Sequence, residues 1–167
     1  MLSKRLDNVA PSVTVGISSK VKEMRANGID VISLSIGEPD FNIPEKAKEY
    51  GKKSLDDNKT KYDFPAGIPE LRQEICKKLK RENHIDYTPD QIVLSSGAKN
   101  SITNVLLVTT DPGSEVLLPL PYWVSYSEMV KVVNAVPVEV KTSKENNFKL
   151  TKDDLLRAIT DKTRLLI

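Results

Sequence analysis

The sequence predicts an α/β protein with a mainly parallel sheet and helices on both faces of that sheet. From residue 91 onward, short apolar runs rich in valine, isoleucine and leucine alternate with segments whose apolar residues recur at helical spacing. The resulting order is strand, helix, strand, helix, strand, helix, strand, which implies parallel strands joined by crossover helices. The length of 167 residues fits one domain or part of a larger one.

Composition narrows the class of protein. The hydrophobic content of 39% and charged content of 29% are typical of a soluble globular protein. The 25 basic and 23 acidic residues are mixed along the chain, so no basic stripe predicts nucleic-acid binding. No apolar run approaches the roughly 20 residues that cross a bilayer, and the first residues lack the apolar core of a signal peptide. We therefore expect a cytoplasmic protein that binds neither nucleic acid nor membrane.

The single cysteine and single histidine predict little chemistry. Cys76 cannot form an internal disulfide, which suits a reducing cytosol, and it fits a small residue on a helix. His84 lies in a polar segment at a predicted helix exit. Neither has partner ligands nearby in the sequence, which argues against a zinc site and against a Cys–His nucleophile pair. No metal site is expected.

The N-terminal part is predicted to contain an arm, a helix and a strand. Residues 1–16 lack periodicity, and we interpret them as an arm that packs on something else. A helical stripe then ends at Asn27-Gly28, a usual C-terminal signal, and its apolar members are Ile17, Val21 and Met24. Residues 31–36 are apolar, partly alternating and rich in β-branched residues, which predicts a short strand.

A turn at residues 37–42 offers a first possible ligand contact. Gly37 has no side chain, so a ligand carboxylate could approach its backbone N–H closely. The same residues also fit a simple connection from a strand to a helix. That helix is expected to have Pro44 in its first turn, Asn42 as its cap and an end near Asp57.

The loop at residues 58–67 carries two aromatic residues and two lysines. Loops of this length often hold functional residues. The hydroxyl of Tyr62 could anchor a ligand, or the ring could only fill a gap. A helix with apolar residues at every fourth position, starting near Pro69, and a turn at residues 87–90 follow.

Residues 92–100 read as a strand, a tight turn at Gly97 and the first turn of a helix. Such a junction aims unpaired backbone N–H groups and the positive end of a helix dipole at one point, which suits a phosphate. Junctions of this kind also occur with nothing bound, so both interpretations stay open here.

The remaining elements complete the predicted alternation. Strands are expected at residues 115–118, 136–140 and 163–167, and Tyr122-Trp123 are expected to open a helix. Thr151 should cap another helix, filled by Leu155, Leu156 and Ile159, through a capping box with Asp154. The final apolar run does not alternate, so it predicts a buried parallel strand. Because chain termini usually lie at the surface, we expect this chain to be the front part of a longer protein.

Four motifs together resemble one enzyme family. In this order and spacing they are similar to the class I/II aminotransferases, pyridoxal phosphate (PLP) enzymes of fold type I, and nearest to the aspartate aminotransferase-like bacterial subgroup. The resemblance covers essentially the whole chain. It implies an N-terminal arm and small-domain segment at residues 1–42, and the first, truncated part of the large PLP-binding domain at residues 43–167. The motifs are Ser35-Ile36-Gly37-Glu38-Pro39-Asp40-Phe41, Thr60-Lys61-Tyr62 with Ala66-Gly67-Ile68-Pro69-Glu70-Leu71-Arg72, Ser96-Gly97-Ala98-Lys99, and Asp111-Pro112-Gly113 with Pro121-Tyr122-Trp123-Val124-Ser125-Tyr126.

The resemblance implies a phosphate cup and a stacking residue. Gly97, Ala98 and Lys99 match the cup, in which the N–H groups of Ala98 and Lys99 would do most of the binding. Trp123 resembles the aromatic residue that stacks on the pyridine ring beside the substrate. The alternative for Trp123 is a core residue just after a turn.

The resemblance also implies a substrate contact and a partner subunit. Gly37 resembles the glycine whose backbone meets the substrate carboxylate. Tyr62 resembles the tyrosine that reaches the PLP phosphate of the neighbouring subunit, which implies a homodimer with shared sites.

No catalytic residue is assigned within this chain. Lys99 is not the expected Schiff-base lysine, because the family carries that lysine downstream of the region matched here. The chemistry needs PLP as an electron sink and a lysine as Schiff-base partner and proton shuttle. We therefore expect the chain alone to be inactive. Small departures from the family pattern, such as Asn100 and Asn134-Ala135, bear on loop shape and substrate choice.

The implied function is transfer of an amino group from an amino acid, aspartate-like or other, to a 2-oxo acid. One alternative is a PLP-dependent lyase of the same fold. Another is a non-catalytic truncated module for binding or dimerisation, although residues 1–16 are too short for the DNA-binding domain that regulators of this family carry. A nicotinamide-binding protein is disfavoured, because no Gly-x-Gly-x-x-Gly follows a predicted strand.

Overall fold

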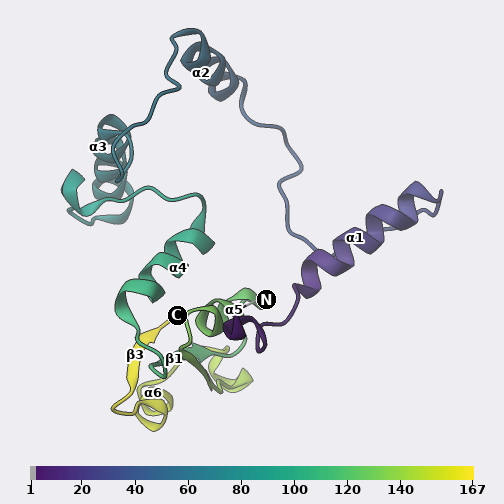
Figure 1. Cartoon of the computed structure of the whole chain (residues 1–167), viewed down its shortest axis with the longest axis vertical. Coiled ribbons are helices and arrows are strands. Elements are labelled where there is room, and N and C mark those ends of the chain that lie inside the picture. Colours follow the sequence, from purple (N-terminus) through teal and green to yellow (C-terminus); the bar gives the residue numbers. More distant parts are fainter. Residues whose placement is uncertain (1–2) are drawn as a thin grey trace. The chain divides into compact units, whose positions relative to one another are not determined.

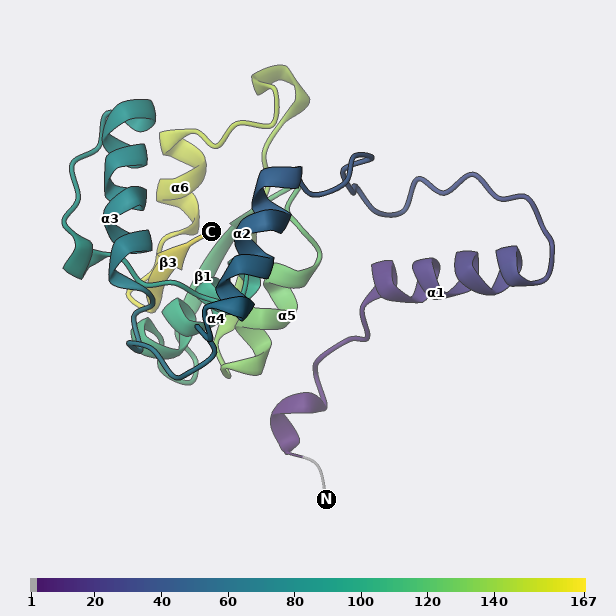
Figure 2. The same ribbon diagram turned by 90° about the horizontal axis from the view of Figure 1, so that it is seen from above.

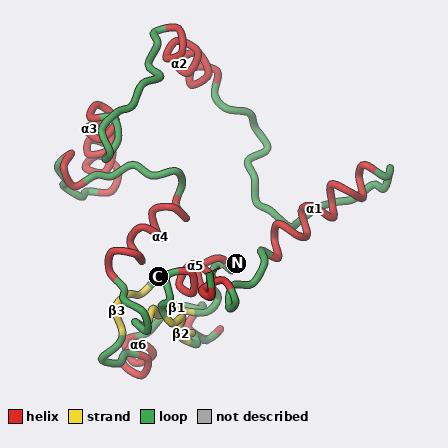
Figure 3. The backbone as a smooth tube through the Cα atoms, viewed as in Figure 1, coloured by secondary structure: helices red, strands yellow, loops and turns green. Residues whose placement is uncertain are grey.

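The computed structural model describes residues 3–167, so Met1 and Leu2 of the predicted arm lie outside the described residues. The chain divides into two compact units. The first comprises the residues up to Ile36 together with Lys99–Ile167, and the second comprises Gly37–Ala98. The helices and strands, drawn in Figures 1 and 3, are α1 Val13–Ala26, α2 Glu45–Asp56, α3 Pro69–Lys78, α4 Ala98–Thr109, β1 Glu115–Pro119, α5 Ser125–Val132, β2 Val136–Val140, α6 Lys152–Ala158 and β3 Thr163–Leu166.

The first unit contains a parallel three-stranded sheet in the order β2-β1-β3. The connection through α5 leads from β1 to β2, and the connection through α6 leads back across β1 to β3. Because parallel crossovers are right-handed, two connections that run in opposite directions place their helices on opposite faces. Figure 2 shows α5 and α6 on either side of β1. The predicted parallel sheet with helices on both faces is confirmed.

The core lies around the central strand β1. Val116 and Leu118 are fully buried and cluster with Leu106 of α4 and Val130 of α5. Side chains alternate along a strand, so Leu117, which is also buried, points to the opposite face of the sheet. A strand buried on both faces needs a continuous apolar run, which is what β1 has.

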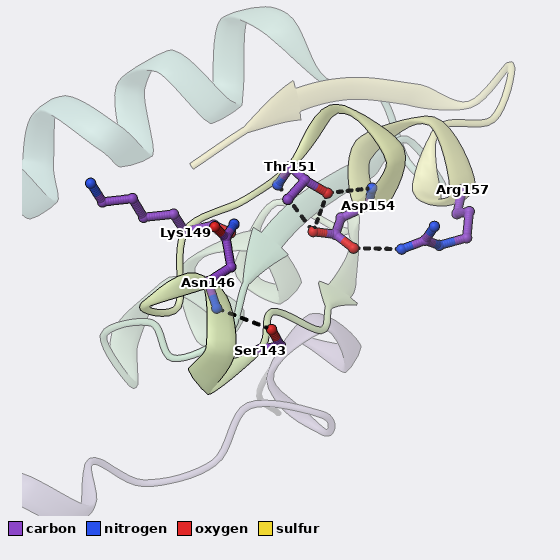
Figure 4. A network of polar contacts seen from close by, with 6 residues as sticks. All are labelled: Ser143, Asn146, Lys149, Thr151, Asp154 and Arg157. Carbon is purple, nitrogen blue, oxygen red and sulfur yellow. Dashed lines mark hydrogen bonds and ion pairs between the residues drawn. The ribbon is translucent and has the colours of Figure 1, made fainter.

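The start of α6 confirms the predicted capping box. Thr151 Oγ1 accepts a hydrogen bond from the Asp154 N–H at 3.1 Å, and Asp154 Oδ2 accepts one from the Thr151 N–H at 3.0 Å (Figure 4). Arg157 donates to the same carboxylate. The hydrogen bonds from Thr151 are the main cause that lowers the pKa of Asp154 below its ordinary value. The cap therefore holds an ionised carboxylate at the positive end of the helix. Ile159 follows the helix as its C-cap rather than filling it.

Two predicted strands do not form. Residues 31–36 have no strand partner among the described residues, and Ile32 and Leu34 are 89% and 94% exposed. Residues 92–95 make one backbone bond to the loop before α3, from the Leu94 N–H to the Ala66 carbonyl at 3.0 Å, and join no ladder. A strand exists only through hydrogen bonds to a neighbour, so an apolar alternating run without one stays extended but unpaired. Within residues 3–167, the sheet therefore has three strands and not four.

Some predicted boundaries are also wrong. The arm is partly helical, because a short 3-10 helix covers Lys4–Leu6 and α1 begins at Val13, where the Ser12 hydroxyl accepts the Val15 N–H. Asn42 is not the cap of α2, which begins at Glu45 directly after Pro44 and has no side-chain cap bond. Tyr122-Trp123 precede α5, which begins at Ser125. Helix ends depend on a few local hydrogen bonds that periodicity does not report.

Candidate functional site

The turn before α4 presents backbone donors. Gly97 has a φ of +85°, a left-handed conformation that glycine adopts without strain, and a Cβ built there would meet nothing within 4 Å. The helix then starts at Ala98. The N–H groups of a first helical turn have no acceptor within the helix, and the helix dipole makes this end positive. The backbone of Ala98 and Lys99 can therefore bind an anion.

The side chain of Lys99 meets an aromatic ring. Its Nζ lies 5.8 Å from the centroid of the Trp123 ring, within the range of a cation–π contact. Trp123 is 46% exposed and Lys99 is also exposed. The first unit thus brings a cation from the start of α4 together with an accessible indole from the segment between β1 and α5. Such a pair suits a ligand with a flat ring and a negative charge.

The segment that carries Trp123 is anchored on strand β2. The Tyr122 hydroxyl donates to Glu139 Oε1 at 2.8 Å, and the Leu120 N–H donates to the Val140 carbonyl at 2.9 Å. Thr142 donates its hydroxyl to the Leu120 carbonyl. Burial, and then the bond to Glu139, raises the pKa of Tyr122, so the phenol stays protonated as a donor. The sequence does not indicate this support, because no short-range signal links residues 17 positions apart.

The other predicted site residues lie in the second unit. Tyr62 is fully exposed in the loop between α2 and α3. Gly37 lies in an exposed extended segment, and a Cβ built there would meet nothing within 4 Å. Both backbones are therefore open to a ligand or to another chain. Their predicted roles, in the substrate contact and in the partner's site, stay predictions.

The groups described above suit a phosphorylated aromatic cofactor. The first turn of α4 offers N–H groups to a phosphate, Lys99 offers a positive charge, and Trp123 offers a ring face. Cys76 is a free, half-buried residue on α3. Within residues 3–167, no group of three or more His, Cys, Asp and Glu side chains is arranged to hold a metal ion. The same part of the chain has no helix of the length and apolarity that a membrane span needs.

Comparison with known proteins identifies the family. The family model described as "Aminotransferase class I and II" matches residues 29–167. A probable aspartate/prephenate aminotransferase of Thermus aquaticus is 43% identical over 166 residues, which are 99% of this chain and 43% of that protein. The aspartate aminotransferase of Bacillus sp. (strain YM-2) is 43% identical over 167 residues, which are 100% of this chain and 43% of that protein.

Solved structures agree with the sequence comparison. The aspartate aminotransferase from Thermus thermophilus with maleate matches with a TM-score of 0.95 and 43% identity over 99% of this chain and 44% of that chain. The aspartate aminotransferase from Rhizobium meliloti matches with a TM-score of 0.92 and 36% identity over 99% of this chain and 42% of that chain. These matches confirm the resemblance and fold type I. The chain spans about 43% of the length of the curated relatives it matches.

Proposed function

The chain belongs to the class I and II aminotransferase family, and on that premise we propose that it is the N-terminal portion of a PLP-dependent aminotransferase. The whole enzyme would move an amino group from an amino acid to a 2-oxo acid. Lys99 over the Trp123 ring, at the open first turn of α4, is the observation that supports this proposal most directly.

Each site residue has a proposed role toward PLP. The N–H groups of Ala98 and Lys99 bind the phosphate, and Gly97 makes the turn that exposes them. Trp123 stacks on the pyridine ring, a contact worth about 1 kcal/mol beyond area burial. Bound PLP supplies an electron sink for the amino-acid substrate.

Two further residues, both in the second unit, also have proposed roles. The Gly37 N–H binds the substrate carboxylate, since its backbone is open. Tyr62 binds the phosphate in a partner subunit, which makes the enzyme a homodimer with shared sites. The full exposure of Tyr62 supports a contact with another chain.

We also propose the domain division and the substrate class. Residues 1–42 form the arm and small-domain segment, and residues 43–167 form the first part of the large PLP-binding domain. The amino-group donor is an aspartate-like amino acid. Two observations support this: relatives are named aspartate and aspartate/prephenate aminotransferases, and the exposed Lys99 favours anionic ligands. A cytoplasmic location is consistent with the single free cysteine.

Cofactor binding by the whole gene product tests the proposal. Absorbance should show bound PLP, and aspartate with 2-oxoglutarate should give oxaloacetate and glutamate. A Trp123→Leu variant should lose PLP more readily, whereas Val124→Ala, at the neighbouring exposed position, should not. A gene product that binds no PLP would contradict the proposal. Breakdown of the amino acid with release of ammonia or carbon dioxide, and without conversion of 2-oxoglutarate to glutamate, would favour the lyase. Transamination by the 167-residue chain on its own would overturn our view that the Schiff-base lysine is missing from it.

A further inference from the structure

One glycine of the second unit has a close neighbour. A Cβ built at Gly67 would lie 2.4 Å from Leu94 Cδ1 and 2.8 Å from Leu94 Cβ, distances that real Cβ atoms do not adopt. The φ of Gly67 is +98°. At every other glycine of residues 3–167, a Cβ would meet nothing within 4 Å. The Leu94 side chain therefore sits directly on the backbone at the end of the loop that carries Tyr62.

Backbone hydrogen bonds hold the same two segments together. The Leu94 N–H donates to the Ala66 carbonyl at 3.0 Å. Arg72 of α3 donates from Nη1 to the Pro89 carbonyl at 3.0 Å, and its Nε is buried without a hydrogen-bond partner. Residues 88–94 are thus fastened to α3 and to the residues just before it.

The attached segment, residues 88–94, lies directly before the proposed phosphate cup. Gly97 follows Leu94 by three residues, and α4 starts at Ala98. The segment from 92 to 95 belongs to no strand, so a sheet does not fix its position. The contact with Gly67 and the bond to Ala66 hold Leu94 of this segment against the residues that precede α3.

We propose that Gly67 and Leu94 form a clamp that positions the phosphate cup for PLP. Both are positioning residues, since they act through the backbone of residues 95–98 and do not touch the cofactor themselves. The inference rests on the proposed function. It adds that the end of the Tyr62 loop and the entry to the cup move as one body.

Two glycine substitutions distinguish the effect of a clash with Leu94 from the effect of backbone strain. Gly67→Ala introduces both a positive-φ strain and a clash with Leu94, whereas Gly28→Ala, at φ +78° with open space around it, introduces the strain alone. Measured on the whole gene product well below its unfolding temperature, Gly67→Ala should weaken PLP binding by about tenfold or more, the scale on which supporting contacts affect a site. Gly28→Ala should change it by less than about threefold. Adding Leu94→Ala to Gly67→Ala removes the two nearest atoms and should restore part of the affinity.

Hydrogen exchange in the PLP-free protein gives a second readout. The Leu94 amide should be protected in the native protein and in Gly28→Ala, and should lose protection in Gly67→Ala. Equal PLP affinities for the two glycine variants, or a lower unfolding temperature of Gly67→Ala with unchanged affinity, would overturn the clamp. A native protein that protects the Leu94 amide but binds no PLP would overturn the proposed function, and with it the role of the clamp in positioning a cup.

Discussion

Replacement of Leu106 by alanine should cost the first unit a large part of its stability. Leu106 is fully buried and packs in one cluster with Val116, Leu118 and Val130. The substitution removes three buried carbons and leaves a void that the neighbouring side chains of β1 and α5 cannot fill without moving. Buried Leu→Ala changes of this kind cost about 2–5 kcal/mol. We expect the upper half of that range, because β1 is a central strand with little freedom to shift.

The next residue of the same helix supplies the control. Leu107 is 58% exposed, so Leu107→Ala should cost less than about 1 kcal/mol, while its effect on helix propensity is the same as at Leu106. Urea unfolding followed by Trp123 fluorescence gives both free energies by linear extrapolation. If Leu106→Ala lost no more stability than Leu107→Ala, the core described here would be wrong.

Substitutions at three further residues test contacts of the arm, a cap and the segment before α5. The carboxylate of Glu128 accepts hydrogen bonds from the Ala10 N–H at 2.7 Å and from the Lys131 ammonium at 2.8 Å. Burial acts to raise the pKa of Glu128, but these bonds outweigh burial, so the pKa is lowered. The stabilisation that ionised Glu128 contributes is therefore present above the ordinary pKa of 4.5, and it is lost as the pH falls through the lower pKa of the folded state. Glu128→Gln should flatten the acid side of a plot of unfolding free energy against pH. An unchanged slope would show that the contact is absent. Thr151→Ala should lower the free energy of unfolding by about 1 kcal/mol, and Thr151→Ser should lower it by much less, since serine keeps the capping oxygen. Equal losses for the two variants in urea unfolding would rule out the cap. Tyr122→Phe should cost about 1 kcal/mol through loss of its bond to β2, and a variant as stable as the native chain would show that this bond contributes nothing.

The elements predicted correctly are those whose signals are local. An uninterrupted apolar run predicts strand β1, and the Thr151–Asp154 capping box predicts the start of α6. The turn at Gly97 follows from one glycine placed before a helical stripe. In each case, residues within a few positions of one another determine the conformation.

The two predicted strands that do not form required a distant partner. Residues 31–36 and 92–95 have strand-like sequences, but a strand needs a neighbour's hydrogen bonds and the described chain provides no ladder for either. The polar support of Trp123 was missed for the same reason, since Tyr122 and Glu139 meet only after β2 pairs with β1.

The sequence by itself determined the class of fold, the helices and the residues that could serve a phosphate and a flat ring. It could do so because periodicity, caps and glycine turns act over a few residues, and because the motifs stand in a specific order. Tertiary structure alone decided the strand order β2-β1-β3, the approach of Lys99 to Trp123 and the seating of Leu94 on Gly67. These contacts join segments far apart along the chain, so they arise only when burial and backbone pairing bring the segments together.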